Sequence, residues 1–255
     1  MYGEIIKNSK LLQSLSEKLL PKKQYVNYDN SIIPLPENRW CGPEFKDDIF
    51  YLKSAENESR RIENNFFCNQ DSKVLDIGCG QGRLPIGILR RLGSLNYLGL
   101  DIDKNSIQWC KKYIQNKNAS FLFKHLNIHN ERYNNEGVKI DNNFKFELES
   151  GSFDIVYLYS VFSHTTEHDM KIYLKEISRI LNTTGMLFFT TFVENNIPNF
   201  TINPKDHHLT ISGPLHVVQY EKNYLFSILK DYGFTIQNFS HKTEADGQSA
   251  VYLKK

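Results

Sequence analysis

A run of glycines directly after a short apolar segment constrains the fold of this chain more than any other feature. Val74, Leu75 and Ile77 form the apolar segment, and glycines follow at positions 78, 80 and 82. Residues 84–92 then show the apolar spacing of a helix. This pattern predicts a buried parallel strand, a tight turn and a helix. Glycine suits such a turn because it tolerates positive φ and leaves room for a ligand beside the backbone.

The spacing within the turn separates two classes of nucleotide-binding protein. A dinucleotide fingerprint has a third glycine where this chain has Arg83, which argues against a nicotinamide oxidoreductase. Asp76 precedes the first glycine by two residues, and Asp-x-Gly-x-Gly-x-Gly resembles motif I of the class I S-adenosylmethionine (SAM)-dependent methyltransferases. The resemblance implies that Asp76 helps to hold the ammonium group of SAM, which also carries a cationic sulfonium. The resemblance also implies that the turn packs around the methionine and ribose of SAM through Gly78, Cys79, Gly80 and Gly82.

A second buried strand is predicted over residues 97–103, with acidic residues at its C-terminal end. It resembles motif II of the same family, which implies that Asp101 binds the ribose hydroxyls and that Ile102 packs on the adenine. Asp103 is predicted to cap the following helix. In the next motif of the family, an acidic residue accepts a hydrogen bond from the adenine amino group. In this chain Asn127 stands at the position of that acidic residue. An amide oxygen can accept the same bond without charge assistance.

The complete pattern predicts an α/β fold, namely a doubly wound, seven-stranded sheet of the class I methyltransferase type whose last strand is antiparallel. Residues 1–70 are expected to form a helical and irregular extension that caps the active site, and residues 71–255 the SAM-binding domain. Within the extension, residues 5–20 have an amphipathic helix pattern, and residues 25–43 are interpreted as an irregular arm across the cofactor end of the sheet. Further strands are predicted over residues 120–126, 144–148, 153–159, 186–192, 234–239 and 249–254, and helices over 56–68, 107–114, 167–181 and 220–232, with a helix stop at 182–185.

Two long excursions, residues 129–151 and 193–218, interrupt this pattern. Loops of that length in compact domains tend to be functional or disordered. Tyr133 in the first excursion is a candidate for the acceptor site. The second is interpreted as a polar lid, from which one of three histidines could reach the acceptor. These histidines are His207, His208 and His216.

The predicted strand over residues 153–159 resembles motif IV of the family and leads into Ser160 and His164. Tyr159 is expected beside the cofactor and Ser160 beside the acceptor. His164 is the candidate general base, since an unperturbed pKa of about 6.5 suits proton removal near neutrality. The alternative is a structural histidine that caps the next helix or binds a buried carbonyl.

The composition and the absence of several motifs limit the classes of molecule that could accept the methyl group. The net charge of +2 over 255 residues indicates no nucleic-acid surface, and no segment is apolar enough to span a membrane. The four cysteines form no C-x-x-C pair, so we expect a reducing cytoplasm and no metal site. No Asn/Asp-Pro-Pro-aromatic tetrapeptide, no catalytic Pro-Cys pair and no paired acids of the catechol methyltransferase type are present. A small molecule, a glycan or a peptide remains as the acceptor.

We therefore expect a SAM-dependent methyltransferase acting on a hydroxyl of a small molecule or saccharide. N-methylation of an amine or peptide is the enzymatic alternative, because a neutral amine needs no base. A SAM-binding scaffold or partner protein is the non-enzymatic alternative. The amphipathic pattern over residues 5–20 is consistent with docking on the same domain or with a homodimer.

Overall fold

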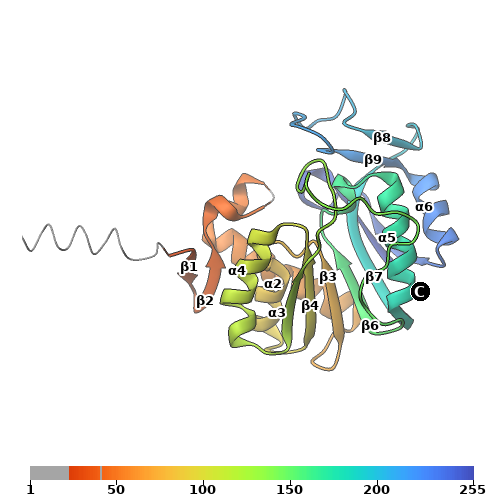
Figure 1. The fold of residues 1–255 in the computed structure, drawn as a ribbon. Helices are drawn as coiled ribbons and strands as arrows, with labels where there is room; N and C mark the ends of the chain where they lie inside the picture. Colours follow the sequence, from red (N-terminus) through yellow and green to blue (C-terminus); the bar gives the residue numbers. More distant parts are fainter. Residues whose placement is uncertain (1–22, 41) are drawn as a thin grey trace, which may run out of the picture.

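The computed structural model describes residues 23–40 and 42–255, and the amphipathic pattern over residues 5–20 lies outside them. In the described part, a central sheet is covered by helices on both faces (Figure 1). The main strands are β3 (Lys73–Ile77), β4 (Asn96–Asp101), β5 (Phe121–His125), β6 (Phe153–Leu158), β7 (Leu181–Glu194), β10 (Thr235–Ser240) and β11 (Ser249–Lys254). The helices are α2 (Asp48–Phe66), α3 (Arg83–Arg91), α4 (Lys104–Tyr113), α5 (Glu167–Ile180) and α6 (Lys222–Asp231). Across these residues, no helix is long and apolar enough to cross a membrane.

The seven main strands lie in the order β10-β11-β7-β6-β3-β4-β5. β3 is parallel to both β4 and β6, whereas β11 is antiparallel to both of its neighbours, β7 and β10. The predicted doubly wound sheet with an antiparallel last strand is therefore confirmed. The chain leaves β3 for β4 on one side and reaches β6 on the other. A crevice for a ligand is expected at the carboxyl ends of strands where the order reverses in this way.

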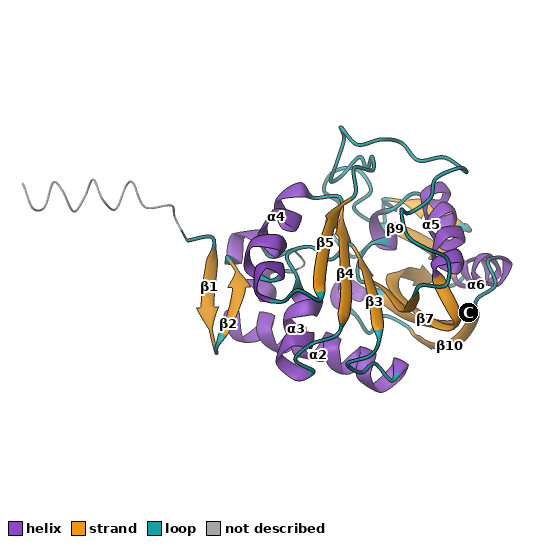
Figure 2. Cartoon of the chain, turned by 60° about the horizontal axis from the view of Figure 1, so that its bottom comes forward, coloured by secondary structure: helices purple, strands orange, loops and turns teal. Residues whose placement is uncertain are grey.

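Neighbouring side chains of the central strands face opposite layers of helices. Val74 and Tyr97 pack into a cluster with residues of α2, α3 and α4, whereas Leu75 and Leu98 pack into a cluster with residues of α5 and α6. Figure 2 shows the sheet between these two sets of helices. Burial on both faces explains why the strands read as continuous apolar runs and not as alternating ones.

The segment interpreted as irregular over residues 25–43 begins with a β-hairpin, so that interpretation was wrong in part. β1 (Tyr25–Tyr28) pairs antiparallel with β2 (Ser31–Pro34). Asp29 and Asn30 form the turn with φ values of 45° and 59°, and two consecutive positive φ values suit a two-residue hairpin turn. The short helices η1 (Pro36–Asn38) and η2 (Pro43–Lys46) follow. Strands of four residues are too short to produce a clear periodic signal.

Helix boundaries near the sheet also differ from the predictions. α2 begins at Asp48, well before residue 56, because the Asp47 side chain accepts a hydrogen bond from the Phe50 amide and caps the helix. β7 begins at Leu181, immediately after α5, so the residues predicted to stop that helix lie within the strand. Asp103 caps α4 as predicted, accepting from the Asn105 and Ser106 amides.

The two excursions have different structures. The second contains β8 (Phe200–Ile202) and β9 (Val218–Glu221), which pair antiparallel, and β9 also pairs parallel with β7. They extend the sheet to nine strands. The first excursion, whose residues are all described, contains isolated β-bridges, and the strand predicted over residues 144–148 is wrong. The aromatic residues there pack on Tyr173 of α5 instead.

Candidate cofactor and acceptor site

A cavity of about 620 Å³ opens at the carboxyl ends of β3, β4 and β6. Its size lies within the range of small-molecule sites, which is about 300–1,000 Å³. Its lining comes mainly from residues 37–40, the glycine turn, the end of β4, and parts of the segments 128–133 and 157–165. Side chains of α2 and α5, together with His216 and Asp246, complete it. The cavity is therefore at the edge of the sheet where topology places a ligand.

The glycine turn brings bare backbone to this cavity. Gly78 has a φ of 79°, and a Cβ there would lie 2.4 Å from Cγ2 of Val161. Its amide donates to the Leu100 carbonyl at 2.7 Å, which joins the turn to the end of β4. Gly82 faces away from the cavity, and a Cβ there would lie 2.5 Å from Cδ1 of Ile114. Sterics on the protein side therefore exclude side chains at both positions.

Two acidic residues flank the turn, and burial raises the pKa of both carboxyl groups. Asp76 is 3% exposed and accepts a hydrogen bond from the Tyr97 hydroxyl at 2.6 Å. Burial raises the pKa of its carboxyl to about 7. Asp101 accepts from the amides of Gly80 and Asp103, each at 2.7 Å, and burial raises its pKa to about 6. A cation in the cavity would favour the ionised form of both groups.

The residues expected beside the adenine do not all line the same cavity. Ile102 lines the main cavity, together with Leu126. Asn127 lines a smaller neighbouring cavity instead, and its Oδ1 accepts from Nδ2 of Asn134 at 3.3 Å. Cys79 is buried within the turn, and burial raises the pKa of its thiol well above the usual value. Such a thiol is a poor nucleophile.

His164 lies in the short helix η4 (Phe162–His164) and lines the cavity. Its Nδ1 lies 3.0 Å from the Leu215 carbonyl oxygen. Because a carbonyl only accepts, Nδ1 carries the proton and Nε2 is left with a lone pair. Nε2 lies 3.4 Å from Oγ of Ser160. Burial lowers the pKa of His164 to about 4, so the imidazole is neutral at physiological pH.

Ser160 is held in an unusual backbone conformation between β6 and η4. Its φ is 58°, in the left-handed region that a non-glycine residue seldom adopts. Its amide donates to Oγ1 of Thr190 at 2.8 Å, and its Oγ accepts from Nε2 of Gln248 at 2.8 Å. Thr190 in turn donates to Oε1 of Gln248. The bonds to Thr190 of β7 and to Gln248, just before β11, fix the direction in which the chain leaves β6.

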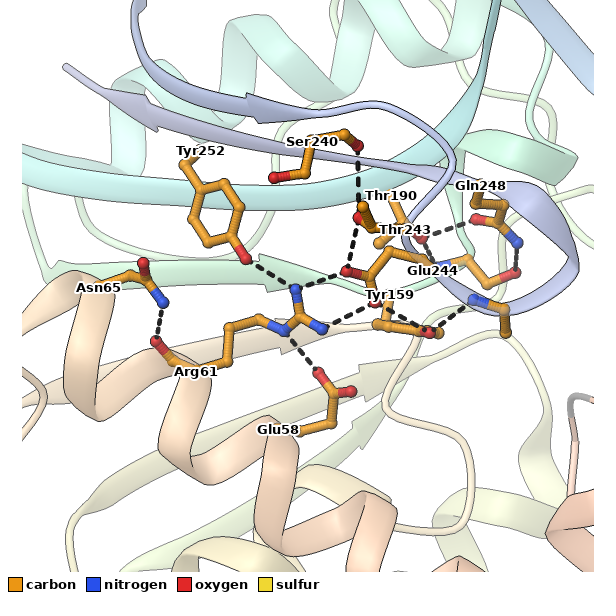
Figure 3. A network of polar contacts seen from close by, with 12 residues as sticks. Glu58, Arg61, Asn65, Tyr159, Thr190, Ser240, Thr243, Glu244, Gln248 and Tyr252 are labelled. Atoms are coloured by element: carbon orange, nitrogen blue, oxygen red, sulfur yellow. Dashed lines mark hydrogen bonds and ion pairs between the residues drawn. The ribbon is translucent and has the colours of Figure 1, made fainter.

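A buried ionic network supports Tyr159 and was not predicted from the sequence. Arg61 of α2 lies between Glu58 and Glu244, bonding Oε2 of Glu58 at 3.2 Å and Oε2 of Glu244 at 2.7 Å (Figure 3). The Tyr159 hydroxyl lies 3.3 Å from Glu244, and the Arg83 guanidinium covers the Tyr159 ring at 4.3 Å. Arg61 and Glu244 are 183 residues apart, so no local sequence signal could join them.

The acceptor candidates fall into two groups. Tyr133 and His216 line the cavity, and the Tyr133 ring lies edge-on to His164 with centroids 5.7 Å apart. His207 packs against Phe192, and His208 bonds the Asp246 carbonyl; neither lines the cavity. Within residues 23–40 and 42–255, no group of three or more potential metal ligands occurs.

Comparisons with known proteins agree with this geometry. A family model described as "Methyltransferase domain" matches residues 75–187. A curated relative named tRNA (guanine-N(7)-)-methyltransferase, from Christiangramia forsetii, is 33% identical over 85 residues, which cover 33% of this chain and 33% of the relative. The chain thus spans about a third of the length of that relative.

Solved structures share the fold at low identity. The [4+2]-cyclase SpnF is 12% identical, with a TM-score of 0.58 over 80% of this chain and 82% of that one. The O-methyltransferase of a trans-AT PKS multienzyme of Brevibacillus brevis, in complex with S-adenosyl-L-homocysteine, is 17% identical, with a TM-score of 0.52 over 74% of this chain and 54% of that one.

The fold and the site first define a Rossmann-like domain whose crevice suits a positively charged nucleoside. More closely, residues 75–187 match a methyltransferase domain, and the fold is that of class I SAM-dependent methyltransferases.

Proposed function

We propose that the protein transfers the methyl group of SAM to a hydroxyl of a small molecule or saccharide, with His164 as the general base. The observation that carries the proposal is the hydrogen bond from Nδ1 of His164 to the Leu215 carbonyl. This bond leaves Nε2 as the proton acceptor, on a residue that lines the cavity. A positioned base of this kind contributes roughly 10²–10⁴-fold to a rate.

The residues around the cavity fit the cofactor. Asp76 would lie near its ammonium group, and Asp101 would hold its ribose beside the backbone of Gly78. Ile102 would pack on the adenine and Tyr159 would lie at the methionine end. Asn127 remains a proposal for the adenine amino group, because its Oδ1 accepts one bond from Asn134 and keeps a second lone pair. Residues 37–40 and Gly42 line the cavity, which supports a capping role for the N-terminal segment.

Methyl transfer to a hydroxyl requires a place for the methyl group, for the electron pair of the broken bond and for the hydroxyl proton. Bound SAM would supply a methyl group on a cationic sulfur, which would keep the electron pair of the carbon–sulfur bond on transfer. The acceptor oxygen forms the new bond to that methyl carbon, and its hydroxyl proton passes to Nε2 of His164. The resulting imidazolium then returns the proton to solvent. Positioning of the two reactants accounts for most of the available acceleration, up to roughly 7–11 kcal/mol.

The strength of the base sets how much it contributes. A pKa of about 4 keeps His164 neutral in the physiological range but makes it a weak proton acceptor. We therefore expect its contribution near the lower end of the range for general bases. An acidic hydroxyl would be a better substrate than an aliphatic one.

N-methylation of an amine or peptide is the enzymatic alternative, and a SAM-binding scaffold is the non-enzymatic one. The name of the Christiangramia relative, a tRNA methyltransferase, makes RNA a further acceptor to test. The cyclase neighbour shows that this fold also occurs in a protein named for chemistry other than methyl transfer.

The test is transfer of labelled methyl from SAM to pooled small molecules, saccharides, peptides and tRNA. We expect label in a hydroxyl compound, a roughly 10²-fold lower rate in His164→Ala, and unchanged SAM affinity in that variant. Label in an amine or in tRNA would refute the hydroxyl proposal. Nearly full turnover of His164→Ala with a verified hydroxyl acceptor would exclude the base role.

A further inference from the structure

Two large aromatic side chains lie exposed on the wall of the cavity. Trp40 is 55% exposed and Tyr133 is 40% exposed, although both line the site. Their rings meet edge to face, with centroids 5.9 Å apart. Tyr133 meets His164 in the same manner at 5.7 Å, and a Cβ on Gly80 would lie 3.7 Å from Cδ1 of Trp40. The aromatic wall therefore extends from the cofactor turn to the candidate base.

The backbone beside Trp40 is anchored by its neighbour Arg39. This side chain is almost completely buried and donates to the carbonyls of Pro34, Phe45 and Lys46 and to the Asp48 carboxylate. Trp40 is therefore held at the cavity by a fixed segment. Binding a ligand to an exposed indole costs little conformational entropy when the backbone that carries the indole is already ordered.

Polar side chains beside His164 are bonded within the protein. Oδ1 of Asn130 accepts from the amides of Arg132 and Tyr133, and its Nδ2 donates to the His164 carbonyl. Oγ of Ser160 accepts from Gln248. Asn130 and Ser160 therefore have little hydrogen-bonding capacity left for a polyol, whose hydroxyls lose hydrogen bonds to water on entering the cavity. This wall is therefore poorly suited to a saccharide.

The charge at this wall also disfavours a cationic amine. The Arg132 guanidinium lies over the Tyr133 ring, with its central carbon 5.5 Å from the centroid, and its Nε donates to the Tyr133 hydroxyl. Nη1 of Arg132 donates to the Ser212 carbonyl, which fixes the positive charge at the cavity rim. An ammonium group approaching the same ring would meet like charge.

We propose that Trp40 and Tyr133 form the acceptor subsite of this cavity, and that this subsite takes a planar aromatic ring bearing a hydroxyl group. Aromatic rings favour offset or edge-to-face contacts of the kind that these two side chains offer. A phenolic hydroxyl, with a pKa near 10 as in tyrosine, is also far more acidic than water, at about 15.7. That acidity suits the weak base at His164. The hydroxyl assignment rests on the proposed methyl transfer, whereas binding of the ring does not.

Calorimetry of the full-length protein saturated with S-adenosylhomocysteine tests the subsite without catalysis. The probes are 2-naphthol, its saturated analogue decahydro-2-naphthol, and methyl glucoside. We expect 2-naphthol to bind about tenfold more tightly than the saturated alcohol, and methyl glucoside to give no measurable binding. Trp40→Ala and Tyr133→Ala should each weaken 2-naphthol binding several-fold to about tenfold, with S-adenosylhomocysteine affinity nearly unchanged. The control is Phe67→Asn, which removes an aromatic side chain that is 83% exposed and does not line the cavity, at a left-handed position that asparagine tolerates.

Equal affinity for the saturated alcohol, tighter binding of the glucoside, or full 2-naphthol affinity in both alanine variants would overturn the subsite. If 2-naphthol binds as expected but no methyl group is transferred to any phenol, the subsite stands and the proposed function fails. If methyl transfer occurs and neither alanine variant changes acceptor binding, the function stands and the subsite fails. The two proposals are therefore tested separately.

Discussion

Asp76→Asn should stabilise the cofactor-free protein at pH 8 and have much less effect at pH 5. Burial raises the pKa of this carboxyl to about 7, so the fold favours its protonated form. Stability from this group is fully present below its ordinary pKa of about 3.9 and is lost as the pH rises through about 7. Asparagine is neutral at every pH, and its Oδ1 can still accept the hydrogen bond from Tyr97.

The magnitude follows from the two pKa values. The difference between about 7 and about 3.9 corresponds to roughly 4 kcal/mol at about 1.36 kcal/mol per pKa unit, as an upper limit. Most of this penalty develops between pH 5 and pH 7. The difference in free energy of unfolding between variant and wild type should therefore widen by about 2–3 kcal/mol between pH 5 and pH 8.

Urea unfolding of both proteins without SAM at pH 5, 6.5 and 8 measures this difference. Asp71→Asn is the matched control, since Asp71 is exposed in the turn before β3 and the same substitution there should give a difference that changes little with pH. A variant that is equally stable or less stable than the wild type at pH 8 would refute the reasoning. So would a difference that does not change with pH, because the penalty would then not arise from ionisation of Asp76.

Three further predictions concern the cofactor turn and the base. Asp101→Ala should weaken SAM binding by about 1.5–3 kcal/mol in calorimetry through loss of the ribose contact, and unchanged affinity would assign that contact elsewhere. Gly78→Ala should abolish SAM binding and destabilise the fold by more than the roughly 1–2 kcal/mol expected for left-handed strain alone. Gly93→Ala is the control for backbone strain alone, because Gly93 has a φ of 80° and no atom lies within 4 Å of a Cβ placed there. Equal destabilisation by the two substitutions would rule out a contribution from the clash with Val161. With SAM saturating at every pH, the wild-type transfer rate should fall as the pH drops through about 4, because His164 must be neutral to act as a base. A fall centred near 6.5 that disappears in His164→Ala would contradict the buried environment of that residue.

The central strands and the glycine turn could be predicted because their determinants are local. Val74 to Ile77 are buried from both sides, so their apolar run is visible without knowledge of neighbours. The positive φ of Gly78 and its contact with Val161 explain why the turn shows as glycine in the sequence. The doubly wound sheet with an antiparallel last strand followed from the family resemblance, and the strand pairing confirms it.

Features that depend on contacts between distant segments were not visible. The hairpin β1–β2 has strands of four residues, and β8 has three, so neither gives a periodic signal. The bond that fixes the tautomer of His164 comes from Leu215, at the far end of the second excursion. Trp40 and Tyr133 come from an arm and a loop that the sequence could identify only as separate aromatic segments. Their meeting at one cavity is a property of the fold.

Calorimetric titration of the wild-type protein with SAM, its demethylated product and NAD measures which nucleoside this crevice binds. With Asp76 and Asp101 at its edges, the crevice should hold a positively charged nucleoside. We expect one saturable site for SAM and for the demethylated product, with SAM binding lost in Gly78→Ala, and no binding of NAD. Binding of NAD in preference to SAM would contradict this expectation.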